Sequence, residues 1–448
     1  MAERNRSPAG PNGVTSTLAR GATEAGVAFV AFATRGRALP IGNAPAGRRS
    51  VRPPIRDTMN IEERVARRRR SDDGPHLIRS YDALSPAAHV RDPDGRGSTL
   101  ERLLDHLEPA FDGDLPSNAY VWGPKGSGKS ALVTALFSEL GRVSRDVRSS
   151  IHTTTRVDDT DATGFAYVDA RGTRTEFGLQ HAILDALLDE RVPKQGVGGD
   201  RFVELLEERF AESGRTAVVA IDHLGEPETF PVGTVESFLG RIPESIAWLA
   251  IGRTPPEDRE VQAESTVHLP AYQEYVLVDV LTSRASQGLA HGAISHEELR
   301  RIATWSGGDA HDALAALFGA AVLASEAEKR TIDPETVTAG MEAVPRPSAA
   351  IGQVLALPEN RQRVLRRLLD LDVTDHSIGT SAETIAADES LDLSATTVKR
   401  FLYELAESGV LRRTRAERTD GLGRPPSRVE PRFPTLVFRR VFDAAYGR

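Results

Sequence analysis

The pattern of apolar and polar residues divides the chain into three structured parts that follow an irregular N-terminal segment. From residue 76 to residue 272, short apolar runs alternate with longer segments in which apolar residues recur every three or four positions. The short runs predict buried strands, and the longer segments predict helices. Strands that alternate with helices are typical of a parallel sheet with helices on both faces, so we expect an α/β domain over residues 76–272.

The first expected element of this domain is a helix. Ser98 and Glu101 have the spacing of a capping box, and the leucines that follow fall on one helical stripe. The remaining predicted elements are strands over 118–122, 165–169, 217–221 and 246–251, and helices over 129–140, 179–189, 202–210 and 235–239.

Two further domains are expected to be mainly helical. After residue 272 the strand pattern stops, and four helical segments predict a lid domain over residues 273–345, with Asp333 and Pro334 at the start of its last helix. Residues 346–448 show helices followed by a basic hairpin rich in glycine and proline, which is the order of a winged-helix domain. The helices are expected over 276–286, 297–305, 309–329, 334–341, 361–371, 382–387 and 395–408.

Residues 1–75 lack any sustained period and are rich in glycine, alanine, proline and arginine, so they predict a disordered basic segment. Met59 opens a charged, helix-like stretch and is an alternative start of the chain. A basic arm that contacts DNA is a second interpretation of this segment.

Composition excludes several classes of protein. The 448 residues contain no cysteine, which excludes disulfides, cysteine-ligated zinc, thiolate catalysis and iron–sulfur clusters. The 11 histidines show no H-E-x-x-H pairing, so a zinc hydrolase is not expected. No apolar stretch approaches the roughly 20 residues that span a bilayer. We therefore expect no membrane partner and a cytoplasmic, nucleoid-associated protein.

A phosphate-binding loop follows the first predicted strand. Residues 123–130 match G-x-x-x-x-G-K-[ST] without exception, between a strand and a helix. In such a loop Lys129 reaches the β and γ phosphates, Ser130 binds Mg²⁺, and backbone amides surround the phosphates. ATP and Mg²⁺ are therefore the predicted cofactors. The predicted nucleotide-binding residues are Gly123, Pro124, Lys125, Gly126, Ser127, Gly128, Lys129, Ser130 and Ala131.

A phosphate loop also needs an acid at the end of a neighbouring strand to hold magnesium. Asp222 follows five small or apolar residues at the end of the strand predicted over 217–221. Asp169 ends another predicted strand but lacks the same apolar run. Ser130 and Asp222 are therefore the predicted metal ligands.

The residue after this acid bears on hydrolysis. Active ATPases of this organisation usually place a glutamate there to orient the attacking water, and here the residue is His223. A neutral imidazole positions water less effectively than a carboxylate. Glu226 could substitute if the loop turns back. The alternative is that His223 is an ordinary loop residue of a weak ATPase, so the sequence leaves hydrolysis open.

These motifs resemble a known family. Residues 114–130 with the acidic strand at Asp222 look like the AAA+ module of archaeal replication initiators, which are relatives of the eukaryotic origin-recognition and cell-division-control proteins. The resemblance covers about residues 80–445. It implies an AAA+ fold with a helical lid and a winged helix, and an ATP-binding switch that recognises origin DNA. A replicative helicase and self-association are further partners that it implies.

The chain departs from the family at several positions. The family's Asp-Glu pair is Asp222-His223 here, and the residue that senses the γ phosphate falls at Arg253. The lid motif Gly-Asp-Ala-Arg becomes Gly-Asp-Ala-His, which ends at His311. Arg259 is the candidate for an arginine finger that acts on a neighbouring subunit. The candidate catalytic residues are thus Asp222, His223, Glu226, Arg253, Arg259 and His311.

A DNA-binding surface is predicted at the C-terminal end. Residues 395–405 form a candidate recognition helix, which Ser394 can cap and which buries Val398, Phe401, Leu402 and Leu405. Six arginines follow in residues 412–428 against Glu417 and Asp420. This pattern favours a helix in the major groove and a wing on the backbone. The predicted DNA-binding residues are Thr396, Thr397, Lys399, Arg400, Arg412, Arg413, Arg424 and Arg428.

Three functional classes fit these sequence features. The first is a replication initiator that binds double-stranded DNA under the control of ATP. The second is a transcription regulator or signalling ATPase built from the same parts. The third is an adaptor that binds ATP without hydrolysing it, and for any of them the winged helix could instead make protein contacts.

Overall fold

The computed structural model describes most of the chain after residue 75. The predicted disordered segment, with Met59, lies outside the described residues. None of the described helices is long and apolar enough to cross a membrane. The described residues are 76–91, 93–151, 163–173, 175–187, 204, 205, 208, 210, 216–227, 229–239, 245–258, 263–371, 376–415 and 427–446.

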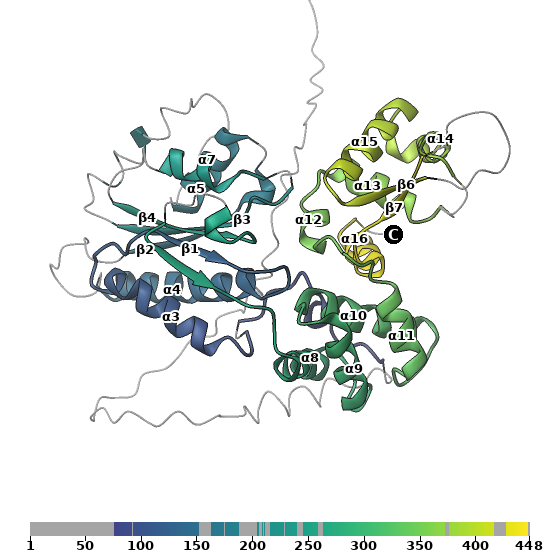
Figure 1. The fold of residues 1–448 in the computed structure, drawn as a ribbon, viewed down its shortest axis with the longest axis horizontal. Helices are drawn as coiled ribbons and strands as arrows, with labels where there is room; N and C mark the ends of the chain where they lie inside the picture. Colours follow the sequence, from purple (N-terminus) through teal and green to yellow (C-terminus); the bar gives the residue numbers. More distant parts are fainter. Residues whose placement is uncertain are drawn as a thin grey trace, which may run out of the picture. The chain divides into compact units, whose positions relative to one another are not determined.

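A parallel sheet of five strands forms the centre of the first domain (Figure 1). The spatial order is β2-β3-β4-β1-β5, so β4 separates the strand before the phosphate loop from the strand that carries Asp222. The sequence did not predict β5, because among its four residues only Val267 is buried. The strands are β1 (Ala119–Trp122), β2 (Gly164–Asp169), β3 (Ala217–Leu224), β4 (Ile246–Gly252) and β5 (Ser265–His268).

Helices cover both faces of this sheet, as the alternating pattern predicts (Figure 1). Helices α3 (Gly97–Leu107) and α4 (Lys129–Ile151) pack on one face, and α5 (Glu176–Leu187) and α7 (Val232–Leu239) pack on the other. The predicted capping box is wrong. Helix α3 starts one residue before Ser98, with Arg96 as its N-cap, so that serine lies inside the first turn.

The strand β3 is buried along its whole length and extends beyond its predicted end at Ile221. Its register with β4 shifts between Ile221 and Leu224, and His223 in this stretch has a φ of 66°. Such a left-handed conformation is uncommon for a residue other than glycine, although histidine adopts it more readily than most. The bulge thus gives the residues after Asp222 a path that a regular strand does not allow.

Four helices follow the sheet where the sequence predicts the lid, and their core is rich in alanine. Helix α10 buries most of its residues, and the close approach of α11 depends on Gly340, where a Cβ would lie 2.6 Å from the backbone nitrogen of Ala320. Asp333 caps α11 as predicted, since it accepts a hydrogen bond from the Thr336 N–H at 2.8 Å. The helices are α8 (Glu274–Gly288), α9 (His296–Ser306), α10 (Ala310–Glu326) and α11 (Pro334–Glu342).

The largest buried side chain of this lid gives a test of its packing. Phe318 on α10 is 1% exposed. We expect Phe318→Ala to destabilise the protein by about 3–5 kcal/mol, because the cavity adds to the lost apolar burial. Denaturant unfolding followed by circular dichroism measures this change. Glu326→Ala, at the exposed end of the same helix, should change the stability little.

The C-terminal part has the element order of a winged helix (Figure 1). The helices α12 to α15 precede a two-stranded antiparallel hairpin, β6 with β7. The sequence did not predict the last helix, α16, which packs against α10 of the lid. The elements are α12 (Ile351–Leu355), α13 (Glu359–Leu368), α14 (Ile378–Ala386), α15 (Ala395–Glu407), β6 (Leu411–Arg415), β7 (Ser427–Pro431) and α16 (Thr435–Tyr446).

Candidate nucleotide and DNA sites

The loop between β1 and α4 passes very close to Tyr272 and Asp309, which follow the sheet in the sequence. Gly126 and Gly128 have positive φ values of 71° and 83°. A Cβ on Gly126 would lie 2.0 Å from Oδ1 of Asp309, and one on Gly128 would lie 2.5 Å from the hydroxyl of Tyr272. Both the conformation and the lack of space require glycine at these two positions, of which the phosphate-loop motif fixes Gly128.

The ammonium group of Lys129 lies within the curl of this loop. Its Nζ donates to the carbonyl oxygens of Gly123 and Pro124 at 2.7 and 2.8 Å. Burial lowers the pKa of Lys129 to about 8, although Asp222 acts in the opposite direction. A buried cation surrounded by loop backbone can gain charge-assisted hydrogen bonds from a phosphate.

Asp222 receives two hydrogen bonds although it is only 1% exposed. The hydroxyl of Tyr167 donates to its Oδ2 at 2.7 Å, and the backbone N–H of His223 donates to its Oδ1 at 2.6 Å. The Ser130 hydroxyl lies nearby and also stabilises its charge. Burial acts to raise the pKa of Asp222, but His223 and these hydroxyls outweigh it, so the pKa lies below its ordinary value.

Ser130 and Asp222 therefore meet, although the strands that lead to them are not neighbours in the sheet. The strand β4 lies between β3 and β1, so the expectation of a neighbouring strand is wrong. Ser130 is the second residue of α4, and its hydroxyl nevertheless lies near the carboxylate of Asp222. These two oxygen groups are the ligand type that Mg²⁺ prefers.

The competing acid, Asp169, lies in register with Asp222 on the adjacent strand β2. Its carboxylate is held by the guanidinium of Arg171, with Nε to Oδ1 at 3.0 Å and Nη2 to Oδ2 at 2.7 Å. Burial acts to raise the pKa of Asp169, but the hydrogen bonds and charge of Arg171 lower it below its usual value. Asp169 thus already has a charged partner.

The loop after β3 turns back and brings Glu226 to His223. The Nδ1 of His223 lies 3.1 Å from Oε1 of Glu226, and Nη2 of Arg253 lies 2.7 Å from the same oxygen. Burial opposes the charge of Glu226, but its contacts with His223 and Arg253 lower its pKa to about 2. The structure thus brings together three of the residues predicted as catalytic.

Lys125, predicted to bind nucleotide, is directed to the lid. Its Nζ lies 2.7 Å from Oδ2 of Asp309, 2.6 Å from Oδ1 of Asp312 and 2.9 Å from the hydroxyl of Ser348. Asp312 is 3% exposed, and Ser348 donates to it at 2.5 Å. We call Lys125, Asp309, Asp312 and Ser348 the loop–lid junction. The sequence did not predict it, because its members come from three distant segments.

His311, at the lid position where the family carries an arginine, contacts the segment that leads into the C-terminal part. Its Nε2 accepts the backbone N–H of Ile351 at 2.8 Å, and its Nδ1 lies 3.1 Å from Oδ1 of Asp312. Burial lowers the pKa of His311. Since Ile351 starts α12, the imidazole caps an N–H that the helix itself leaves unpaired.

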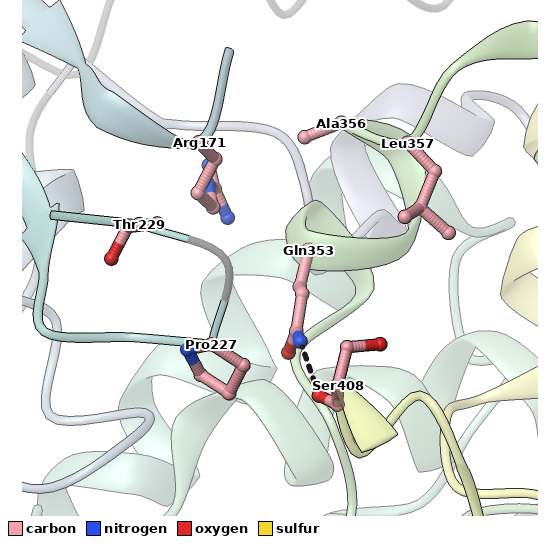
Figure 2. Close-up of a pocket in the computed structure, with 7 residues that line it drawn as sticks. All are labelled: Arg171, Pro227, Thr229, Gln353, Ala356, Leu357 and Ser408. Atoms are coloured by element: carbon pink, nitrogen blue, oxygen red, sulfur yellow. Dashed lines mark hydrogen bonds between the residues drawn. The ribbon is translucent and has the colours of Figure 1, made fainter. Parts of the chain in front are cut away.

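A small pocket lies where the α/β part approaches the C-terminal part (Figure 2). The backbone of α12 comes close to Arg171, because a Cβ on Gly352 would lie 2.2 Å from its Nη1. On the C-terminal side, Nε2 of Gln353 donates to the carbonyl oxygen of Ser408 at 3.0 Å. The lining residues are Arg171, Pro227, Thr229, Gln353, Ala356, Leu357 and Ser408.

The predicted recognition helix is α15, and its buried side is confirmed. The side chains of Val398, Phe401, Leu402 and Leu405 are buried, and Ser394 caps the helix by accepting the Thr397 N–H at 3.2 Å. On the other side, Thr396, Lys399 and Arg400 are exposed, and Thr397 is half-buried. The helix therefore presents polar and basic groups to solvent.

The wing is less basic than the arginine count predicts. Arg412 on β6 forms an ion pair at 2.5 Å with Glu430 on β7, an acid that lies beyond the residues of that count. Arg413 lies over the ring of Tyr403 at 5.3 Å from its centroid, and Arg428 is half-buried. Arg424 and the predicted arginine finger Arg259 lie outside the described residues.

Comparison with known proteins identifies two parts of the chain. Residues 93–239 match the family model of the AAA ATPase domain, and residues 278–342 match that of the Cdc6 AAA+ ATPase-type lid domain. The ORC1-type DNA replication protein of Methanoregula boonei is 24% identical over 348 residues, which cover 70% of this chain and 78% of the relative. ORC1-type DNA replication protein 6 of Halobacterium salinarum is 23% identical over 335 residues, which cover 70% and 83%.

A solved structure shares the fold. The Aeropyrum pernix ORC1 protein, in a structure in complex with DNA, matches with a TM-score of 0.55 and 21% identity, over 83% of this chain and 98% of that chain. The AAA ATPase domain, the Cdc6-type lid and the shared fold agree with the resemblance seen in the sequence motifs. The chain thus contains an AAA ATPase domain and a Cdc6-type lid domain, and it is similar to ORC1-type DNA replication proteins.

Proposed function

We propose that this protein is an ATP-dependent switch of the replication-initiator type, which binds origin DNA through its C-terminal winged helix. The observation that carries this proposal is the convergence of Lys129, Ser130 and Asp222 at the start of α4. A phosphate loop with its lysine, hydroxyl and acid in one place is the arrangement that binds a nucleoside triphosphate. The names of the relatives, which are DNA replication proteins, support the biological role.

The residues present fit ATP and Mg²⁺. The Lys129 ammonium already lies among loop carbonyls at 2.7 and 2.8 Å, where it supplies donors for phosphate oxygens. The hydroxyl of Ser130 and the carboxylate of Asp222 are oxygen ligands that lie near each other, and they would hold the metal. When bound, Mg²⁺ neutralises part of the phosphate charge.

The loop–lid junction supports a route from the nucleotide to the C-terminal part. Lys125 belongs to the phosphate loop, Asp312 to α10, and Ser348 to the segment before α12. His311 adds a second link, because it caps α12 from the lid. We infer that phosphate entering the loop competes for Lys125 and shifts the position of the winged helix.

Slow or absent hydrolysis is part of the proposal. The residue after Asp222 is a histidine whose Nδ1 is engaged by Glu226, and the arginine at the predicted γ-phosphate sensor, Arg253, contacts the same carboxylate. His311 contacts Ile351 and Asp312. These partners favour a protein that holds ATP for long periods over a fast motor.

The mapping of bound genomic sites tests the role of the protein. We expect chromatin immunoprecipitation to recover a small number of sites that coincide with the start of DNA synthesis. Enrichment at promoters alone would favour a transcription regulator instead. ATP binding without any phosphate release would favour the switch or the adaptor over a signalling ATPase.

Replacement of Lys125 tests the coupling. We expect Lys125→Met to bind ATP, since Lys129 and Ser130 remain, but to lose the difference in DNA affinity between the ATP and ADP states. Coupling energies of this kind are typically worth about 5- to 150-fold in affinity. The measurement is DNA binding by fluorescence anisotropy with each nucleotide.

The matched control for this variant is Lys329→Met. Lys329 also forms an ion pair within the lid, at 2.6 Å to Asp333, but it is not part of the phosphate loop. Lys329→Met should keep the full difference in DNA affinity between the ATP and ADP states. If both variants behave as the wild type does, the loop–lid junction does not transmit the nucleotide state.

A further inference from the structure

Two acids lie side by side at the carboxyl edge of the sheet, the buried Asp222 and the partly exposed Asp169. Asp169 and Asp222 are register partners on the parallel strands β2 and β3. Two negative charges on adjacent strands disfavour the ionisation of both groups. Each carboxylate therefore needs a partner that stabilises its charge. The guanidinium of Arg171 holds Asp169 with two hydrogen bonds, at 3.0 and 2.7 Å. Asp222 is therefore the acid that remains for a ligand.

Hydrogen bonds hold the Asp222 carboxylate in place. In the described part of the chain, no lysine or arginine forms an ion pair with it, although it is 1% exposed, and Nε2 of His223 lies 3.5 Å from its Oδ2. Its hydrogen-bond donors are the hydroxyl of Tyr167 and the backbone N–H of His223. A buried carboxylate depends on such donors, because the loss of one leaves a desolvated charge only partly compensated.

The groups around Asp222 differ in their role when a metal binds. The Ser130 hydroxyl would itself become a metal ligand. The backbone N–H of His223 reaches only Oδ1. Tyr167 donates to the other oxygen, Oδ2, at 2.7 Å. Its hydroxyl is therefore the side-chain donor that stays on the carboxylate.

We propose that Tyr167 is a positioning residue whose hydroxyl orients the Asp222 carboxylate for Mg²⁺. This inference rests on the proposed function, because it concerns the metal that accompanies the nucleotide. Groups that hydrogen-bond to a ligating carboxylate fix its orientation and strengthen metal binding. Tyr167 would thus act through Asp222 and never contact the nucleotide.

Tyr167→Phe tests the inference, because it removes a single oxygen from the side chain. We expect the affinity for ATP in the presence of Mg²⁺ to fall about 10- to 100-fold, which is typical for the loss of such a hydrogen bond. The affinity measured with EDTA should match that of the wild type. Isothermal titration calorimetry with and without Mg²⁺ separates the two effects.

Tyr120→Phe is the matched control. Tyr120 on β1 is also buried in this sheet, and its hydroxyl donates at 2.8 Å to the backbone carbonyl of Thr254. This variant loses a comparable hydrogen bond without a change at Asp222. We expect it to keep the wild-type ratio between the ATP affinities with and without Mg²⁺.

Two results would overturn the inference. One is that the ratio of the ATP affinities with and without Mg²⁺ is the same in Tyr167→Phe as in the wild type. The other is an equal loss of affinity with and without the metal, which indicates a purely structural role. A wild-type protein that fails to bind ATP contradicts the proposed function instead.

A double-mutant cycle provides a second measurement. Asp222→Asn should remove the Mg²⁺ effect, and adding Tyr167→Phe to it should change nothing further. If Tyr167→Phe lowers the ATP affinity equally in both backgrounds, the tyrosine does not act through Asp222. The inference is then wrong.

Discussion

Lys129→Ala is expected to lower the affinity for ATP at least about 100-fold, to the point where calorimetry detects no binding. The ammonium supplies charge-assisted hydrogen bonds to phosphate, each worth about 1.5–3 kcal/mol, and a neighbouring side chain does not replace them. Lys129 is also the most buried cation of the loop, and burial lowers its pKa to about 8. Its removal should therefore leave the folded state nearly as stable as before.

The control for this variant is Lys329→Ala, which removes a lid lysine that is 38% exposed in its side chain. It should bind ATP as the wild type does. Thermal unfolding of both variants shows whether the fold is retained. Wild-type ATP affinity in Lys129→Ala would mean that the nucleotide, if it binds at all, does not use the phosphate loop.

The second large effect is expected at the recognition helix α15. The double variant Lys399→Glu with Arg400→Glu should weaken DNA binding more than tenfold at low salt, because two exposed basic groups become acidic. The salt dependence should also become shallower, by about one unit of slope for each phosphate group that the variant no longer binds. Anisotropy titrations of a labelled duplex at several salt concentrations measure both quantities.

The matched control reverses two charges elsewhere. Arg142→Glu with Arg300→Glu changes exposed arginines on α4 and α9, outside the winged helix, by the same total charge. We expect a small loss of DNA affinity from the net charge alone. An equal loss in both double variants would favour a winged helix that makes protein contacts.

Local sequence signals identified the residues that meet at the candidate nucleotide site. The glycines and Lys129 of the phosphate loop are recognisable because the mechanism requires them at fixed spacing. Asp222 was found from the apolar run before it, since a fully buried strand leaves such a run in the sequence. The helix α15 was likewise visible from its buried stripe and its serine cap.

The contacts between distant segments could not be predicted in this way. Lys125 looks like any loop lysine in the sequence, and only the packing of α10 brings Asp309 and Asp312 to it. The pairing of Arg412 with Glu430 depends on the register of the hairpin between β6 and β7. Such partners decide whether a charged side chain remains available to a ligand.

Two errors have a local physical reason. The strand β5 was missed because an edge strand with one buried residue, Val267, has no apolar run. The capping box at Ser98 failed because α3 starts earlier, with Arg96 as an N-cap that makes no side-chain hydrogen bond. The hydrogen bond from Tyr167 to Asp222 was also missed, since nothing in the strand pattern of β2 distinguishes that tyrosine from a core residue.

The central claim is that the nucleotide in the phosphate loop controls the winged helix. The most direct measurement is the dissociation constant of the wild-type protein for duplex DNA with Mg²⁺-ATP, with Mg²⁺-ADP and without nucleotide, at one fixed salt concentration. We expect the dissociation constants of the ATP and ADP states to differ by about fivefold or more. Identical constants in all three conditions, with ATP binding shown in the same samples, would contradict it.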